Sequence, residues 1–167
     1  MLDTDALSAI ISAYKQDFER IHKNENYKWK AVKCFQDNWD ESAADFLSML
    51  NRALSKARIL LASQNFYPKG MICDLAEKDP EAVRVMFMAL FDESRPVSER
   101  VDNFIEGAEV LRLKYGGGSW KSHYQTTNSV SVYLFFRYPS KYYIFKYRKF
   151  KDFAAKIQYT DVPKSVF

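Results

Sequence analysis

Cationic and aromatic side chains alternate through the last third of the chain. The members of this set that could contact a nucleic acid are Trp120, Lys121, His123, Tyr124, Arg137, Tyr138, Lys141, Lys146, Arg148, Lys149 and Lys151. Lysine and arginine neutralise phosphates and release counterions, and aromatic rings stack on unpaired or flipped bases. The cations are therefore predicted to hold phosphates. Loop residues are less often committed to a core, so the side chains predicted to touch bases are Trp120, His123, Tyr124 or Tyr138.

The distribution of charge supports this interpretation. The chain has 167 residues and a formal net charge of +4. Residues 1–119 contain 16 Lys and Arg against 19 Asp and Glu, a balance of −3, whereas residues 120–167 contain 9 against 2, a balance of +7. A clustered excess of cations is the electrostatic footprint of nucleic-acid binding. An ordinary hairpin explains the same pattern, because alternation places one set of rings in the core and leaves the lysines in solvent.

A glycine-rich segment before these residues resembles a phosphate-binding loop only superficially. The segment runs from Gly116 to Ser122 and reads GGGSWKS. A P-loop has glycine directly before its lysine, because the backbone amides must curl around the phosphates, and Trp120 occupies that position here. The segment also follows a predicted helix, where a P-loop follows a strand. We therefore interpret it as a linker between two elements and predict no nucleotide hydrolysis.

Metal-dependent and nucleophilic catalysis are also disfavoured. His22 and His123 are the only histidines, and they are not clustered with the other ligands that zinc needs. No lysine has Asp or Glu two residues before it, which excludes the D/E-x-K arrangement of many nucleases. The isolated chain is therefore predicted to be no enzyme, with no catalytic, cofactor-binding or metal-binding residue. Cys34 and Cys73 lie outside any C-x-x-C motif and are expected to be free thiols.

Helical periodicity dominates residues 1–115. Apolar residues at helical spacing predict one helix over residues 7–21, a shorter one over 27–35 and a third over 43–61 that Asp40 or Ser42 would cap. A turn over residues 65–70 precedes a short helix over 71–77. Asp79 and Pro80 then start a helix, because aspartate caps well and proline suits the first helical position. Pro96 opens the last helix of this part, which the glycines at 116–118 end.

The pattern changes after residue 119. Val130, Val132 and Leu134 alternate with other side chains, and residues 142–147 are rich in β-forming types, so residues 129–147 are predicted to form a hairpin around a turn at 138–141. Residues 149–157 return to helical spacing. The predicted fold is a single α+β domain over residues 1–167, with a helical part over 1–115 and a basic, aromatic hairpin plus helix over 120–158.

Composition places the chain among intracellular globular proteins. Hydrophobic residues make up 47% and charged residues 28%, which excludes a disordered chain. The start lacks a basic segment before an apolar one, and no run of about 18 apolar residues exists, so neither a secretory signal nor a membrane helix is expected. We therefore expect a cytoplasmic protein with no membrane partner.

Four stretches together resemble a known family. They are residues 27–39 (YKWKAVKCFQDNW), 66–72 (FYPKGMI), 90–94 (LFDES) and 131–143 (SVYLFFRYPSKYY). They are similar to the region that precedes the AAA+ motor in McrB-like ATPases of modification-dependent restriction systems, over roughly residues 27–157. The resemblance implies a DNA-recognition part, excised from a longer protein, that reads DNA with a modified base such as 5-methylcytosine. Its partners would be the motor domain and a nuclease subunit. The resemblance carries over no individual binding residue.

A second function remains open from the sequence. The chain could be a protein-interaction adaptor that docks a nuclease subunit or another partner without touching DNA. An exposed hydrophobic stripe with dispersed cations would favour the adaptor. A clustered basic groove with exposed rings would favour DNA recognition.

Overall fold

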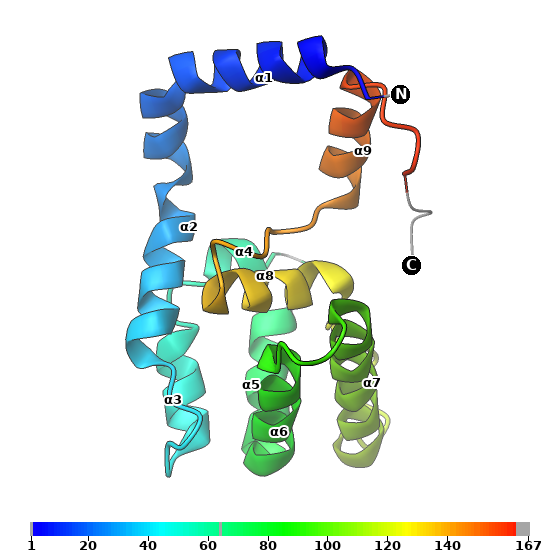
Figure 1. Ribbon diagram of the computed structural model, residues 1–167. Coiled ribbons are helices and arrows are strands. Elements are labelled where there is room, and N and C mark those ends of the chain that lie inside the picture. Colours follow the sequence, from blue (N-terminus) through cyan, green and yellow to red (C-terminus); the bar gives the residue numbers. More distant parts are fainter. Residues whose placement is uncertain (1, 64, 163–167) are drawn as a thin grey trace. The chain divides into compact units, whose positions relative to one another are not determined.

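The computed structural model describes residues 2–63 and 65–162, and these residues form an all-α protein (Figure 1). Within them 68% of residues are helical and 1% form strand, so the predicted α+β class is wrong. The helices are α1 (Thr4–Gln16), α2 (Phe18–Asn38), α3 (Phe46–Ala53), α4 (Arg58–Leu61), α5 (Pro68–Lys78), α6 (Pro80–Phe91), α7 (Val97–Tyr115), α8 (Thr127–Arg137) and α9 (Tyr147–Lys156).

Two compact units divide the chain. The larger unit runs from Tyr27 to Ile144, and the smaller combines residues 1–26 with residues 145–167. Helix α2 contributes its first residues to the smaller unit and the remainder to the larger one.

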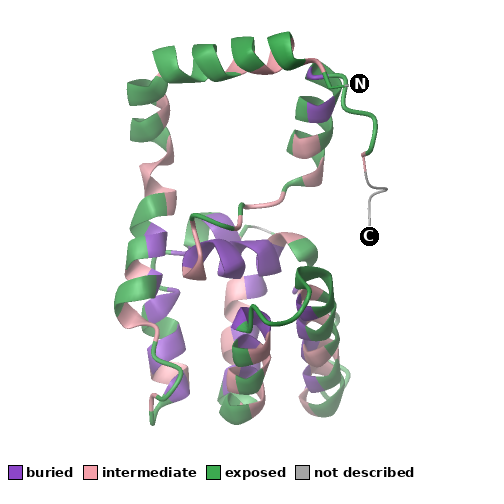
Figure 2. Cartoon of the chain, viewed as in Figure 1, coloured by how far each residue is buried: buried purple, intermediate pink, exposed green. Residues whose placement is uncertain are grey.

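The larger unit is built around α8. Every residue from Ser129 to Phe136 is buried, which makes α8 the most completely enclosed helix of the chain (Figure 2). Helices α4, α6 and α7 pack directly against it, and α5 packs against α6 and α7. Phe87 of α6 and Phe104 of α7 meet Tyr133 of α8 with ring centroids 5.1 and 5.7 Å apart. A cluster of aromatic rings therefore joins these three helices.

The predicted hairpin over residues 129–147 is absent from the described structure, and α8 explains why. A helix that is surrounded on all sides needs apolar residues at every position, so it loses the periodicity that identifies a half-buried helix. The resulting run of valine and aromatic residues resembles a strand. Thr126 and Ser129 mark the true start, because each side chain bonds the other residue's backbone amide in a capping box. Residues 142–146, predicted as the second strand, have no regular secondary structure.

The helical prediction for residues 1–115 is confirmed, with changes at several boundaries. The helix predicted over residues 7–21 is divided at Asp17 between α1 and α2, and α2 continues through the helix predicted over residues 27–35. Asp79 caps α6 by accepting a hydrogen bond from the amide of Ala82 at 3.1 Å, and Pro80 occupies its first position, as predicted. Helix α5 begins at Pro68, inside the predicted turn. The helix predicted over residues 43–61 is divided into α3 and α4, and Asp45 caps α3 in place of Asp40 or Ser42.

The smaller unit has little interior. Helix α1 buries none of its residues, and Ala154 and Ile157 are the buried hydrophobic residues among those described in this unit. A hydrogen bond of 2.9 Å from the amide of Asp3 to the carbonyl of Ile157 joins the start of α1 to the end of α9. Asp3 also caps α1 and accepts a bond from the Gln158 amide at 3.0 Å.

We expect Phe87→Ala to lower the free energy of unfolding by about 3–5 kcal/mol, because it opens a cavity against Tyr133 and Phe104. Val85 lies on the same helix with 62% of its surface exposed, so Val85→Ala should change stability by less than about 0.5 kcal/mol. Urea unfolding followed by far-UV circular dichroism measures both. Equal effects of the two substitutions would contradict the placement of Phe87 in the core.

Candidate nucleic-acid interface

The predicted nucleic-acid-binding residues belong to two different units. Trp120, Lys121, His123, Tyr124, Arg137, Tyr138 and Lys141 lie in the larger unit. Lys146, Arg148, Lys149 and Lys151 lie in the smaller unit, on or next to α9. The predicted residues therefore form two sets, one in each unit.

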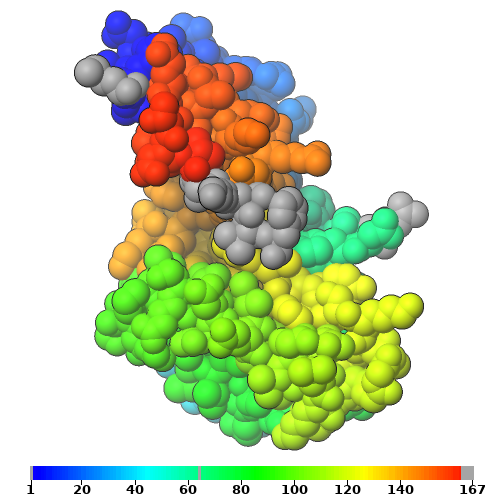
Figure 3. All heavy atoms as spheres, turned by 90° about the vertical axis from the view of Figure 1, so that its right-hand side faces the viewer, coloured from blue at the N-terminus to red at the C-terminus, as the bar shows by residue number. Residues whose placement is uncertain are grey.

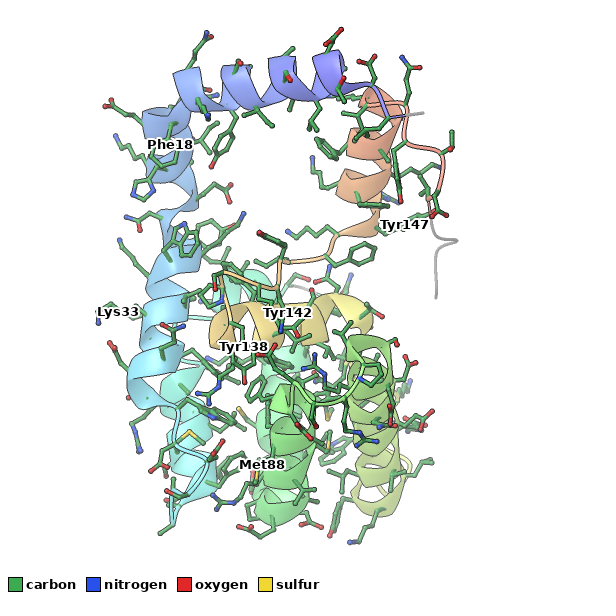
Figure 4. All side chains as sticks on the ribbon, in the orientation of Figure 1. Phe18, Lys33, Met88, Tyr138, Tyr142 and Tyr147 are labelled. Atoms are coloured by element: carbon green, nitrogen blue, oxygen red, sulfur yellow. The ribbon has the colours of Figure 1, made fainter. Side chains whose placement is uncertain are left out.

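Tyr138 is engaged in packing at the end of α8 (Figure 4). Its hydroxyl donates a hydrogen bond of 2.9 Å to the carbonyl of Phe91, and its ring meets the Phe91 ring edge-on at 6.2 Å. The guanidinium of Arg137 lies over the same two rings, 5.8 Å from Phe91 and 5.6 Å from Tyr138. These contacts fix the C-terminus of α8 to the end of α6, and they leave the ring of Tyr138 only partly accessible.

Lys141 is paired within the chain. Its ammonium lies 2.6 Å from the carboxylate of Glu93, which follows α6. The hydrogen bond with Lys141, and a second one from the Tyr142 hydroxyl at 2.9 Å, lower the pKa of Glu93. The bond with Glu93 in turn raises the pKa of Lys141. Lys141 thus remains charged but already has an anionic partner.

Arg100 anchors the same region from inside. Only 3% of its surface is exposed, and it donates to the carbonyl of Leu90 at 2.7 Å and to the hydroxyl of Tyr142 at 2.6 Å. A buried guanidinium needs such partners, because an unpaired charge in the interior is costly. Sequence reasoning missed Arg100. Its position on the apolar face of α7, between Val97 and Phe104, was the available signal.

The loop between α7 and α8 carries Trp120 and Lys121. The carbonyl of Trp120 accepts a hydrogen bond of 2.5 Å from Arg112, whose guanidinium also grips Glu109 through two contacts of 2.7 Å. The Trp120 ring packs partly against the core. Lys121 is exposed and bonds to no described residue, so it is the cation of this loop that is free to meet an anion.

His123 and Tyr124 have structural roles in the same loop. The Nδ1 atom of His123 accepts a hydrogen bond of 3.0 Å from the amide of Gln125. Burial lowers the pKa of His123, although Glu109, with its carboxylate 3.8 Å away, opposes that shift. Tyr124 has a φ of 54°, in the left-handed region, and its ring packs partly against the core.

Gln125 is a further residue that sequence reasoning missed. It is buried, donates to the carbonyls of Pro68 at 2.9 Å and His123 at 3.1 Å, and accepts a bond of 3.0 Å from the Tyr133 hydroxyl. These bonds hold the loop against the start of α5 and against α8. A lone glutamine before an apolar run gives no signal of this role.

The cations of α9 are the accessible ones. Lys146, Arg148, Lys149 and Lys151 are exposed, and no described residue forms an ion pair with them. The apolar residues Phe150, Phe153, Ala154 and Ile157 share the opposite face of the helix, by their spacing. The side chains of α9, orange to red, stand at the molecular surface in Figure 3.

The first turn of α9 lacks the features that usually stabilise a helix start. Lys146 is the N-cap residue and makes no side-chain capping bond, and the first turn contains no acidic residue. Asp3, Asp45, Asp79 and Thr126 cap α1, α3, α6 and α8, whereas α4, α5 and α7 start without a side-chain cap, as α9 does. The start of a helix carries partial positive charge, so cations there are unfavourable and an anion is favourable.

Comparisons with protein-family models, curated proteins and solved structures found no match. The resemblance to the N-terminal regions of McrB-like ATPases therefore stays a prediction from the sequence. Within the described residues, no group of three or more His, Cys, Asp or Glu side chains could hold a metal ion. No helix of the described chain is both long and apolar enough to cross a membrane.

Tyr138→Phe should lower the free energy of unfolding by about 1 kcal/mol, because it removes the hydrogen bond to the Phe91 carbonyl. Tyr143 lies five residues further with 75% of its surface exposed, so Tyr143→Phe serves as the matched control and should have no measurable effect. Thermal and urea unfolding measure both variants. Indistinguishable stabilities would show that the hydroxyl of Tyr138 is not engaged.

His123 should make folding stability depend on pH. Its pKa is lowered in the folded chain, so the unfolded chain binds the proton more tightly, and stability is lost as the pH falls through the ordinary value of 6.5. His123→Asn keeps an acceptor for the Gln125 amide but does not titrate. The variant should therefore lose less stability than the natural chain between about pH 7.5 and pH 5.5. An NMR titration that places the His123 pKa at or above 6.5 would refute this expectation.

Proposed function

We propose that the chain is a nucleic-acid-binding module that contacts phosphates through the start of α9. The observation that carries the proposal is the group of four exposed cations at residues 146–151 around a helix start with no capping side chain. Cations that cost stability in the free chain become favourable when a phosphate lies at the end of the helix axis. The free amides of the first turn then point at the same anion.

Fewer of the predicted cations are free to contact phosphates than the sequence suggested. Arg137 and Lys141 already interact with Phe91 and Glu93, so their contribution to phosphate binding is small in this proposal. Lys146, Arg148, Lys149 and Lys151 surround the first turn and can converge on one backbone segment. Lys121 is an additional candidate in the larger unit. To contact bases, a predicted ring would first have to give up its packing within the chain. This applies to Trp120, His123, Tyr124 and Tyr138.

DNA is the proposed nucleic acid. The resemblance to McrB-like N-terminal regions predicts DNA with a modified base, recognised without catalysis by this chain. In that setting the motor domain and a nuclease subunit would act on what this module binds. Support for the contact with phosphates comes from α9 alone and does not depend on the resemblance.

Lys149→Ala combined with Lys151→Ala should weaken binding to all sequences to a similar degree. Each lost phosphate contact should reduce the slope of log affinity against log salt by about 0.9 on duplex DNA. Fluorescence anisotropy with modified duplex, unmodified duplex and single strands, each at several salt concentrations, measures affinity and slope. Folding should be retained, because exposed lysines contribute little to stability.

Lys30→Ala combined with Lys56→Ala is the matched control. Both lysines are exposed in the larger unit, and the double substitution changes the net charge by the same amount. If the two double variants lose affinity equally, the effect is one of net charge and α9 is not the contact. An unchanged salt slope in the α9 variant would overturn the proposal.

A further inference from the structure

Helix α1 and the start of α2 carry an apolar seam that is largely exposed among the described residues. Its members follow one another at intervals of four, three, four and three residues and are Leu7, Ile11, Tyr14, Phe18 and Ile21. The seam bends at Asp17, because Leu7, Ile11 and Tyr14 lie on α1, whereas Phe18 and Ile21 lie on α2, which runs in a different direction (Figure 1). Exposed fractions at its centre are 45% for Ile11, 50% for Tyr14 and 49% for Phe18. The part of the seam on α1 therefore faces solvent and is long enough to contact a short partner helix.

Helix α1 has little stability of its own in this state. It contains 13 residues, and none is buried. Isolated helices of about 12–15 residues are marginal in water, and helices in proteins owe most of their stability to a packed apolar face. The Tyr14 and Phe18 rings meet edge-on at 6.1 Å and Phe18 stacks on His22 at 5.6 Å, which covers only part of the seam. A stable α1 therefore requires another apolar surface packed against its exposed apolar side chains.

The apolar side of α9 offers such a surface. It borders a hollow of about 310 Å³ whose lining residues are Leu2, Phe150, Phe153, Ala154, Ile157 and Tyr159. Among the described residues, Leu2 and Tyr159 are the lining residues that lie outside α9 and its C-cap. The bond between Asp3 and Ile157 fixes the start of α1 at the end of α9, and the seam from Ile11 onward stays exposed. The seam of one chain consequently leaves its own hollow open.

Charges around the two surfaces are complementary. Residues 3–21 contain four carboxylates and two cations, of which Arg20 pairs with Asp17, whereas residues 146–156 contain five cations and one aspartate. Two copies of α1, or two copies of α9, would bring like charges together. Pairing α1 with α9 brings opposite charges together, which favours that pairing and its orientation.

We propose that α1 of one chain docks on the apolar side of α9 of a second copy. The arrangement is a two-fold symmetric dimer, in which each α1–α9 contact occurs twice. The contact uses Phe150 and Phe153 on α9. It leaves Arg148 and Lys151 on the opposite side of that helix, where they stay accessible to a phosphate.

The oligomeric state of the full chain without nucleic acid tests the proposal. Sedimentation equilibrium should give twice the 19.6 kDa mass of one chain. Ile11→Glu and Phe153→Glu place a charge in the two halves of the contact, and each should give monomers. Ala9→Glu and Ala155→Glu add the same charge on exposed positions of α1 and α9 away from the contact, and both should remain dimers.

Mixing the two monomeric variants distinguishes this pairing from others. A mixed dimer of Ile11→Glu and Phe153→Glu chains has one contact with both substitutions and one with neither. Dimers should therefore reappear on mixing, with weaker affinity than in the natural chain. Far-UV circular dichroism of the whole chain, together with the amide resonances of residues in α1 and α9, shows whether each variant keeps the helices of the smaller unit.

Three results would overturn the inference. The first is a natural chain that stays monomeric at the highest concentration reached. The second is a dimer that survives either Ile11→Glu or Phe153→Glu. The third is the absence of mixed dimers from two folded, monomeric variants. Pairing of α1 with α1 or of α9 with α9 would instead give the second result, because one of the two variants would then stay dimeric.

Discussion

Complete burial of α8 is the constraint on which the larger unit depends. A helix enclosed on every side must satisfy its polar side chains within its own neighbourhood. Ser129 and Ser131 do so by donating to carbonyls three residues earlier, at 3.0 and 2.7 Å. Tyr133, whose burial raises its pKa, reaches Gln125. Because these bonds need the preceding loop in place, the path of residues 116–126 and the packing of α8 are set together.

The same constraint divides the basic residues into two groups. Those at the end of α8 and just after it secure its C-terminus, since the Arg137 guanidinium lies over the Phe91 ring and Lys141 pairs with Glu93. Those on and next to α9 hold nothing in the described chain. The cations look alike in the sequence, but some hold the fold together and others are free to bind a ligand. Only their contacts in the folded chain distinguish the two groups.

The sequence was sufficient where a local interaction decides the structure. Asp79 and Pro80 specify the start of α6 through a cap and a fixed φ, and both signals can be recognised from these two adjacent residues. Choosing Asp45 over Asp40 as a cap depends on how the chain enters α3, which packing determines. The strand-like alternation in residues 130–135 was misleading because burial on all sides removes the helical period. The Thr126 and Ser129 pair was the local clue to the helix. The basic and aromatic composition of the site could be predicted. The roles of Arg100 and Gln125 could not, because they depend on hydrogen bonds to carbonyl groups that are distant in the sequence.

The uncapped start of α9 links the order of this helix to the ligand that it is proposed to bind. A polyanion that supplies the missing negative charge also stabilises the first turn of α9. Part of the binding free energy is then offset by the cost of ordering that turn. Replacing Lys146 by aspartate would provide the cap within the chain and would stabilise the free protein. The same replacement would repel the phosphate and remove the benefit of binding. Stability and affinity therefore oppose each other at this turn, and an uncapped basic start is what a binding function would maintain.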